Sequence, residues 1–194
     1  MKFLSNISTL FILIFVNVMV QPMIYPYSQK HIDILKKGVA FWNSWRDKNP
    51  SEIPDLSNAD ISNLKLSSVN LFKCNLKNTK MKNVFLYKAN LKESDLTGSD
   101  LYYANLWCTD LSNTNLKYVN LKLTHCKYAV FQNANLEGSS FENATLYGAN
   151  LRNANLKNTI FSNANFNFTT VNKKWKEFLK GQCVQFYNSI NWVD

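Results

Sequence analysis

The strongest pattern along the chain is an apolar side chain at every fifth position. From Leu56 to Phe166 each of these positions holds leucine, isoleucine, methionine, phenylalanine or cysteine, and none is polar. Two positions earlier most repeats carry a small or short residue, and the position between the two is mostly Asn or Asp. A period of five fits neither the 3.6 residues of a helical turn nor the alternation of a strand, so neither an amphipathic helix nor a sandwich buries these residues consistently.

A coil with one pentapeptide on each side satisfies this pattern. The large apolar residue and the small residue two positions before it then point inward, and the other three face water. Asn and Asp are expected at the corners, because their side chains bond the nearby backbone and tolerate turn conformations. Stacked coils pair their backbones at about 4.8 Å, as neighbouring strands do. The pattern therefore predicts an all-β solenoid.

The repeated motif A-(D/N)-L-x-x, present at residues 89–93, 104–108 and 149–153, resembles that of the bacterial pentapeptide-repeat family. The resemblance covers residues 54–168. It implies a right-handed quadrilateral parallel β-helix with four pentapeptides in each coil. Nearly six coils would stack into a rod about 28 Å long at the strand spacing.

The two ends of such a rod need covers, because a solenoid otherwise exposes an apolar cross-section and unpaired strand edges. The expected organisation is an N-terminal capping helix over residues 28–50, the repeats over 51–170 and a C-terminal cap over 171–194. Apolar residues near one face of a helix support the first cap: Ile32, Leu35, Val39, Trp42 and Trp45.

The C-terminal cap is expected to contain a second short helix. Val171, Trp175, Phe178 and Leu179 have the spacing of one helical face. Glycine commonly follows the last turn of a helix, so Gly181 is expected to end it.

The amino-terminal segment has the composition of a targeting sequence. Lys2 is its only early charge, and an apolar run extends from Leu10 to Val20. This order predicts a signal peptide and short linker over residues 1–27, and hence export to the periplasm or the outside of the cell. Two alternatives stay open, an uncleaved membrane anchor formed by residues 3–20 and an apolar terminus without a targeting role.

The sequence offers no catalytic site, no metal site and no cofactor motif, and a non-enzymatic protein is predicted. Its two histidines have no metal-ligand spacing. His125 and Cys126 are adjacent, but alternation sends the histidine outward and the cysteine inward, so they cannot form a nucleophile and base. Cys74 and Cys126 lie too many coils apart for a disulfide. The state of Cys108 and Cys183 stays open.

One outward column is richer in aromatic residues than the rest. Residues twenty apart should stack, which places Tyr87, Trp107, Lys127 and Tyr147 in a ladder on one side. The expected partner-binding surface is completed by flanking residues, namely Phe85, Lys88, Tyr102, Tyr103, His125 and Tyr128. Such a surface suits a base, a sugar ring or a partner side chain, although stacked rings also stabilise coils merely by touching.

Three functions compete on this basis. A rigid rod that serves as a binding or scaffold protein for another macromolecule is favoured, with homodimerisation through the rod ends left open. The formal charge of +9 also permits a nucleic-acid or anionic-membrane binder. Some members of the resembling family bind topoisomerase as acidic mimics of DNA. Residues 51–170, however, hold twelve Lys or Arg against nine Asp or Glu, and a mimic of a polyanion should be negative.

Overall fold

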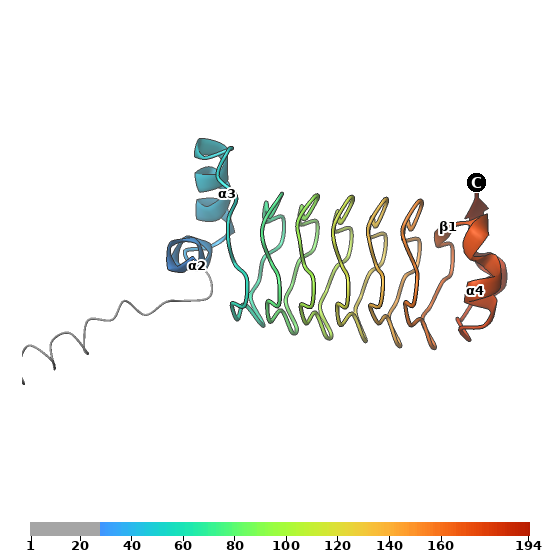
Figure 1. Cartoon of the computed structure of the whole chain (residues 1–194). Coiled ribbons are helices and arrows are strands. Elements are labelled where there is room, and N and C mark those ends of the chain that lie inside the picture. The colour runs from blue at the N-terminus through green and yellow to red at the C-terminus, as the bar shows by residue number, and fades with distance from the viewer. Residues whose placement is uncertain (1–27) are drawn as a thin grey trace, which may run out of the picture.

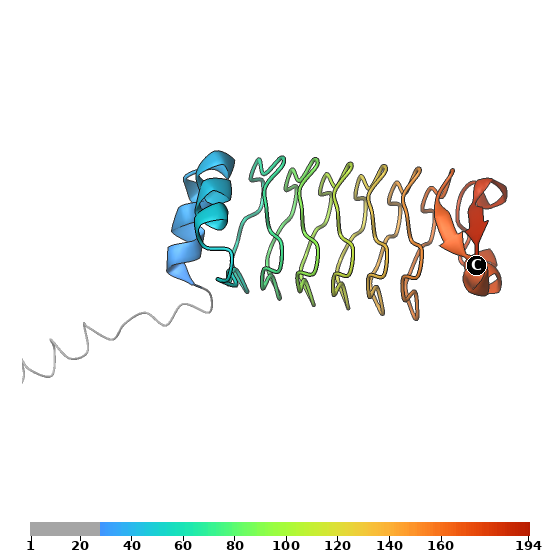
Figure 2. The ribbon, with the colours of Figure 1, turned by 90° about the horizontal axis from the view of Figure 1, so that it is seen from above.

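A computed structural model describes residues 28–194, which form a straight rod of stacked coils between two helical ends (Figure 1). The same stack seen from above is shown in Figure 2. The expected signal peptide, and the alternative anchor of residues 3–20, lie outside the described residues. Within residues 28–194 no helix is long and apolar enough to span a membrane.

The coils are joined by parallel bridges between residues twenty apart. Asp55 pairs with Asn75 and Asn75 pairs with Asp95, and bridges of the same spacing continue along the rod to that between Asn165 and Gln185. Each coil donates backbone N–H groups to carbonyl oxygens of the next, as from Leu56 N to Asn75 O at 2.8 Å. Four pentapeptides therefore make one coil, as the resemblance implied, and the expected parallel solenoid is present.

A left-handed residue closes every corner of the coil. Two positions after each large apolar residue φ is positive, from 53° to 62° at the non-glycine positions. The next backbone N–H donates back to the carbonyl of the apolar residue, as from Ala59 to Leu56 at 3.2 Å. Such a bond with positive φ at the third residue is the pattern of a type II turn, which favours Gly or Asn there. This position is indeed Asn in many coils, as at Asn58 and Asn63.

The Asn and Asp residues that precede the large apolar residue lie beside these corners. They occupy the bridge positions, whereas the sequence pattern placed them in the corners. Their side chains nevertheless bond the backbone as expected: Asp60 Oδ1 accepts from the Ser62 N–H at 3.0 Å, and Asp95 Oδ1 from the Thr97 N–H at 3.0 Å. The Ser62 N–H holds the pKa of the Asp60 carboxyl below its ordinary value.

The interior of the rod is filled by side chains. The large apolar residues of the repeats are at most 2% exposed. Near the C-terminal end the core becomes aromatic: Phe141 lies 5.5 Å from Phe131 and stacks on Phe161 at 5.3 Å. Buried threonine hydroxyls donate to carbonyl oxygens, as from Thr109 to Leu86 at 2.8 Å, so these hydroxyls are satisfied within the core.

The N-terminal end is covered by two helices, α2 (Gln29–Lys36) and α3 (Val39–Lys48), where the sequence pattern indicated one. The helices are separated at Gly38, whose φ of 105° is accessible to glycine alone without strain. Trp42 of α3 and Leu35 of α2 are fully buried against the first coil. The break lets both apolar faces contact the end of the rod.

Polar side chains of α3 donate hydrogen bonds to carbonyls at the N-terminal edge of the repeats, where no preceding coil supplies backbone N–H groups. Trp42 Nε1 donates to the Asn70 carbonyl at 2.7 Å. The Arg46 guanidinium donates to the carbonyls of Glu52 at 2.7 Å and Phe72 at 2.8 Å, and Arg46 is only 5% exposed. The carbonyls of this edge are thereby satisfied, which blocks pairing with another chain.

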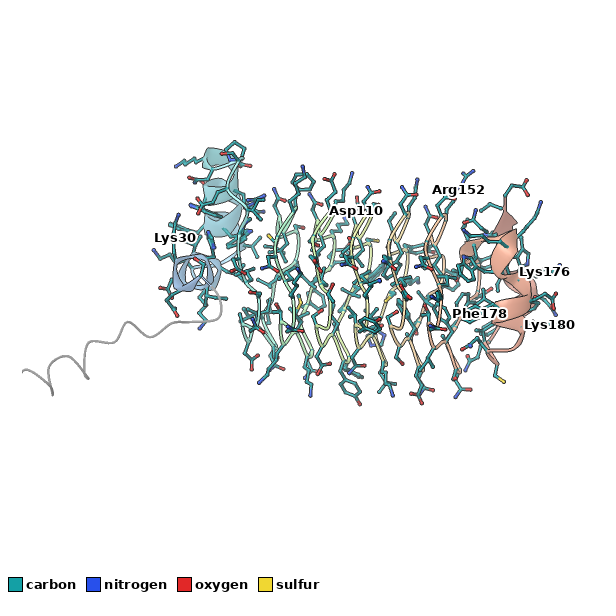
Figure 3. The ribbon with its side chains drawn as sticks, in the orientation of Figure 1. Lys30, Asp110, Arg152, Lys176, Phe178 and Lys180 are labelled. Atoms are coloured by element: carbon teal, nitrogen blue, oxygen red, sulfur yellow. The ribbon has the colours of Figure 1, made fainter. Side chains whose placement is uncertain are left out.

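The C-terminal end is built from short elements rather than one helix: β1 (Thr170–Asn172), η1 (Lys173–Trp175), α4 (Lys176–Lys180), η2 (Tyr187–Ser189) and β2 (Asn191–Val193). Strand β2 pairs in parallel with β1 and continues the stack. Val171 therefore lies in a strand and Trp175 in a 3₁₀ turn, outside the expected helix. Gly181 caps α4, as expected. Figure 3 shows Lys176 and Lys180 projecting from α4 away from the coils.

Candidate partner-binding surface

One side of the rod carries the aromatic ladder. We call this side the aromatic face; it comprises the outward residues of the pentapeptides centred on Leu66, Leu86, Leu106, Cys126, Leu146 and Phe166. The bridge that joins Phe85 to Asn105, and the next that joins Asn105 to His125, stack its residues in register. Side chains twenty residues apart are thus neighbours along the rod.

The rings of this face pack against one another in tilted or edge-to-face pairs. Tyr87 lies 5.4 Å from Trp107 with the two planes at 61°, and Phe85 lies 6.5 Å from Tyr87. Further along the rod Tyr128 and Tyr147 are 5.6 Å apart at 85°. Pairs in this geometry contribute about 0.5–1.5 kcal/mol beyond their buried area, so the rings hold one another in place.

Lys127 links the two ring groups. Its ammonium lies 5.6 Å from the Trp107 ring centre, 5.4 Å from that of Tyr128 and 5.0 Å from that of Tyr147. Lys88 lies over Tyr87 in the same manner, at 5.2 Å. Each contact is within the range of a cation–π interaction. The ladder is therefore a mixed column in which a cation occupies the gap between rings.

The neighbouring side extends the aromatic area as the sequence indicated. Tyr103 packs against His125 across the corner at 5.6 Å, and Tyr102 lies 6.5 Å from Tyr103. The exposed fractions of these tyrosines are 52% for Tyr103 and 38% for Tyr102. On the aromatic face itself Trp107 is 41% exposed. Large rings so exposed on one region are characteristic of interaction surfaces.

Phe168 belongs to this surface and was missed from the sequence. It is 50% exposed and packs against Tyr147 at 5.5 Å. The signal was available, since Tyr128, Gly148 and Phe168 follow one another at intervals of twenty. The aromatic face therefore continues to the last coil before β1.

Several bulky residues of this surface occupy the left-handed corner position. Tyr103, Cys108 and Tyr128 have φ of 58°, 55° and 56°. For residues other than Gly, Asn and Asp this conformation costs on the order of 1–2 kcal/mol. Retaining Tyr at such corners exposes a ring that Asn, the usual corner residue, would not provide.

Gly148 makes room for the ring of Tyr128. Its φ is 64°, and an added Cβ would lie 2.5 Å from the Tyr128 Cδ1 atom. Gly148→Ala is therefore expected to displace the ring and to lower the free energy of unfolding by about 1–2 kcal/mol in a urea titration. The control is Gly181→Ala, because Gly181 lacks a positive φ and its nearest atom would be 3.6 Å away. Equal stability of both variants would contradict this account.

Neither cysteine of the core is poised for chemistry. Burial raises the pKa of both Cys74 and Cys126 to about 12, so both remain thiols at neutral pH. All four cysteines of the chain are free. No group of three or more His, Cys, Asp or Glu side chains that could hold a metal ion occurs in residues 28–194.

His31 is part of the N-terminal cap and lies away from the aromatic face. Its Nδ1 accepts the Asp55 N–H at 3.0 Å, so Nε2 carries the proton and donates to Glu52 Oε1 at 2.9 Å. Hydrogen bonds from Lys30 and then His31 hold the pKa of Glu52 below its ordinary value. This arrangement joins α2 to the first coil and leaves the histidine no free nitrogen.

Comparison with known proteins gives a family but no curated relative. The family model for pentapeptide repeats matches eight copies, in residues 55–86, 70–102, 89–124 and 120–163, which together make up more than half of the chain. No curated protein sequence matches this chain.

Three solved structures of similar shape are distant from this chain in sequence. A pentapeptide repeat protein of the Arabidopsis thaliana thylakoid lumen is 24% identical with a TM-score of 0.41, over 61% of this chain and 76% of that one. QnrB1, a plasmid-mediated fluoroquinolone resistance protein, is 19% identical with a TM-score of 0.48, over 59% and 64%. HetL, involved in heterocyst differentiation regulation in the cyanobacterium Nostoc, is 21% identical with a TM-score of 0.30, over 71% and 79%.

The repeat motif, the coils of twenty residues and the match of the family model agree with one another. The chain belongs to the pentapeptide-repeat family, a membership that implies a right-handed quadrilateral β-helix for its stacked coils.

Proposed function

We propose that this chain is a non-enzymatic binding or scaffold protein whose rod presents the aromatic face to another macromolecule. The observation that carries the proposal is the column of half-exposed rings from Tyr87 to Phe168, fixed by contacts with one another and with Lys127. Members of this family typically serve as scaffolds or binding proteins, in keeping with the proposal.

The rigidity of this column favours binding. Association costs about 0.5–1.5 kcal/mol for each mobile side chain that becomes immobilised. The rings of Tyr87 and Trp107 are already immobilised by their mutual contact, and the coil beneath them is tied by backbone bonds on both sides. Trp and Tyr are also the residues most enriched among those that dominate binding energy.

Export to the periplasm or the outside of the cell is part of the same proposal and is supported by the amino-terminal pattern alone: one early lysine followed by an apolar run. Fractionation of the native host with an intact mass of the recovered protein tests it. Full-length protein in the cytoplasm would remove this part of the proposal and leave the binding surface untouched.

The binding proposal is tested with the double variant Tyr87→Ala/Trp107→Ala. In this experiment the full chain is immobilised and exposed to an extract of its own host. The amount of partner retained should fall at least about 30-fold after the substitution, because residues of this kind dominate binding energy. Quantitative mass spectrometry of the retained proteins measures the change.

A matched control variant is Tyr118→Ala. Tyr118 is the most exposed tyrosine among the large apolar side chains of the described chain, at 63%, but it lies on another side, over Gly138. Its removal should leave retention unchanged. If the double variant retains every interaction of the parent protein, the aromatic face is not the binding surface.

A further inference from the structure

The charges of the rod are distributed unevenly among its sides. Of the twelve basic residues of the repeats, the aromatic face holds Lys65, Lys88 and Lys127. It holds no acidic residue in any outward position. The acidic residues of the repeat region all lie outside it: Glu52, Asp55, Asp60, Glu93, Asp95, Asp100, Asp110, Glu137 and Glu142. The net charge of the repeats is therefore carried by the side that also carries the ring column.

Lysines on the other sides are largely neutralised by ion pairs between coils. Lys117 Nζ lies 2.9 Å from Glu137 Oε2, and Lys122 Nζ lies 2.7 Å from Glu142 Oε2. Four more lysines of the repeats are paired in the same way: Lys73, Lys77, Lys82 and Lys157. None of the three lysines of the aromatic face has an ion-pair partner within residues 28–194.

The ammonium of Lys127 lies among aromatic rings and has no carboxylate partner within residues 28–194. Its ammonium is surrounded by the rings of Trp107, Tyr128 and Tyr147, with centres 5.0 to 5.6 Å away. The rings attract the cation by their quadrupoles but accept no strong hydrogen bond. A carboxylate is the acceptor that would satisfy this ammonium, and residues 28–194 place none in an ion pair with it.

We propose that the aromatic face docks an acidic peptide segment of a partner protein. Carboxylates of the segment pair with Lys65, Lys88 and Lys127, and apolar side chains between them pack on Trp107 and Tyr87. This inference rests on the proposed function and names the chemistry of the partner. Lys65 and Lys127 lie three coils apart, about 14 Å, a distance that some five extended residues span.

The ring geometry favours a peptide over a nucleic acid. Proteins that bind single strands need free ring faces on which bases stack. Here the planes of Tyr128 and Tyr147 meet at 85°, and Lys127 lies over both rings. A long polyanion would also pass the acidic residues of the adjoining sides, among them Asp100 and Glu142. A short acidic segment can remain on the aromatic face, which has no acidic residue.

The experiment uses three dye-labelled probes and the full chain. One is a 12-residue peptide of alternating acidic and aromatic or leucine residues, the second has lysine at the acidic positions, and the third is a 12-nucleotide oligo-dT. Fluorescence anisotropy at low and at high salt measures affinity. The acidic peptide should bind more tightly than the other two, with an affinity that falls as salt rises.

Matched triple variants locate the binding. Lys65→Gln/Lys88→Gln/Lys127→Gln should weaken binding of the acidic peptide by about tenfold or more, a change typical of losing several charge contacts. Lys77→Gln/Lys117→Gln/Lys157→Gln removes as many charges from another side and should change it less than about threefold. Both variants have the same net charge, so a difference between them reports on the face itself.

Four outcomes would overturn the inference: no binding of the acidic peptide, equal binding of the basic peptide, tighter binding of oligo-dT, or equal losses in the two triple variants. The proposed function fails by a different result, full retention of the host partner by Tyr87→Ala/Trp107→Ala. If that double variant loses the partner while the Lys65, Lys88 and Lys127 variant keeps it, the aromatic face binds its partner without acidic chemistry.

Discussion

Phe141→Ala is expected to lower the free energy of unfolding by about 3–5 kcal/mol, as for other fully buried phenylalanines. Phe141 has no exposed surface, lies edge to face with Phe131 at 5.5 Å and stacks on Phe161 at 5.3 Å. Removing its ring opens a cavity between two coils whose backbones are fixed to each other. The coils cannot close around it, because their spacing is set by hydrogen bonds.

Urea unfolding followed by circular dichroism measures this loss, and Phe85→Ala is its control. Phe85 is also a phenylalanine of the coils but is 41% exposed, so its removal should cost less than about 1 kcal/mol. If the two substitutions destabilise the protein equally, the aromatic interior does not hold the C-terminal coils together.

The periodic part of this structure follows closely from the sequence. The period of five comes from the sequence, and the resemblance to the pentapeptide-repeat family implies four such units in each coil. Together they place the column of Tyr87, Trp107, Lys127 and Tyr147 before any coordinates. The inward direction of Cys126 and the outward direction of His125 follow in the same way. Periodicity fixes the position of a side chain because each repeat has the same backbone.

Features that depend on individual contacts could not be derived from the pattern. The position of Lys127 among three rings depends on side-chain conformation. Nor does the repeat indicate that Tyr103 and His125 meet across a corner. The left-handed corner was available in principle, because Asn and Gly recur there, but the Asn and Asp beside it gave the stronger signal.

The caps were predicted less well because they do not repeat. Helical spacing identified the buried face of Trp42 and Leu35, but the break between α2 and α3 rests on a single residue, Gly38. Val171 has the spacing of a helical residue yet lies in β1, since pairing with β2 there continues the stack. Tertiary pairing overrides local preference at such an edge.

Arg46 illustrates a residue whose role no sequence pattern shows. It lies in α3 with its guanidinium buried, and it donates to the carbonyls of Glu52 and Phe72 at the open end of the first coil. Those carbonyls have no coil beneath them to supply donors. The guanidinium is thus a substitute for strand pairing at the end of the rod.

Arg46→Met is accordingly expected to lower the free energy of unfolding by about 2–4 kcal/mol, because it keeps the apolar stem but removes two charged hydrogen bonds to part-buried carbonyls. Urea unfolding measures the loss, and hydrogen exchange should show faster exchange confined to α3 and the first coil. The control, Lys48→Met, removes a cation from an exposed position of the same helix and should change stability by less than about 0.5 kcal/mol. A similar small effect for both variants would mean that water satisfies the edge carbonyls as well as Arg46 does.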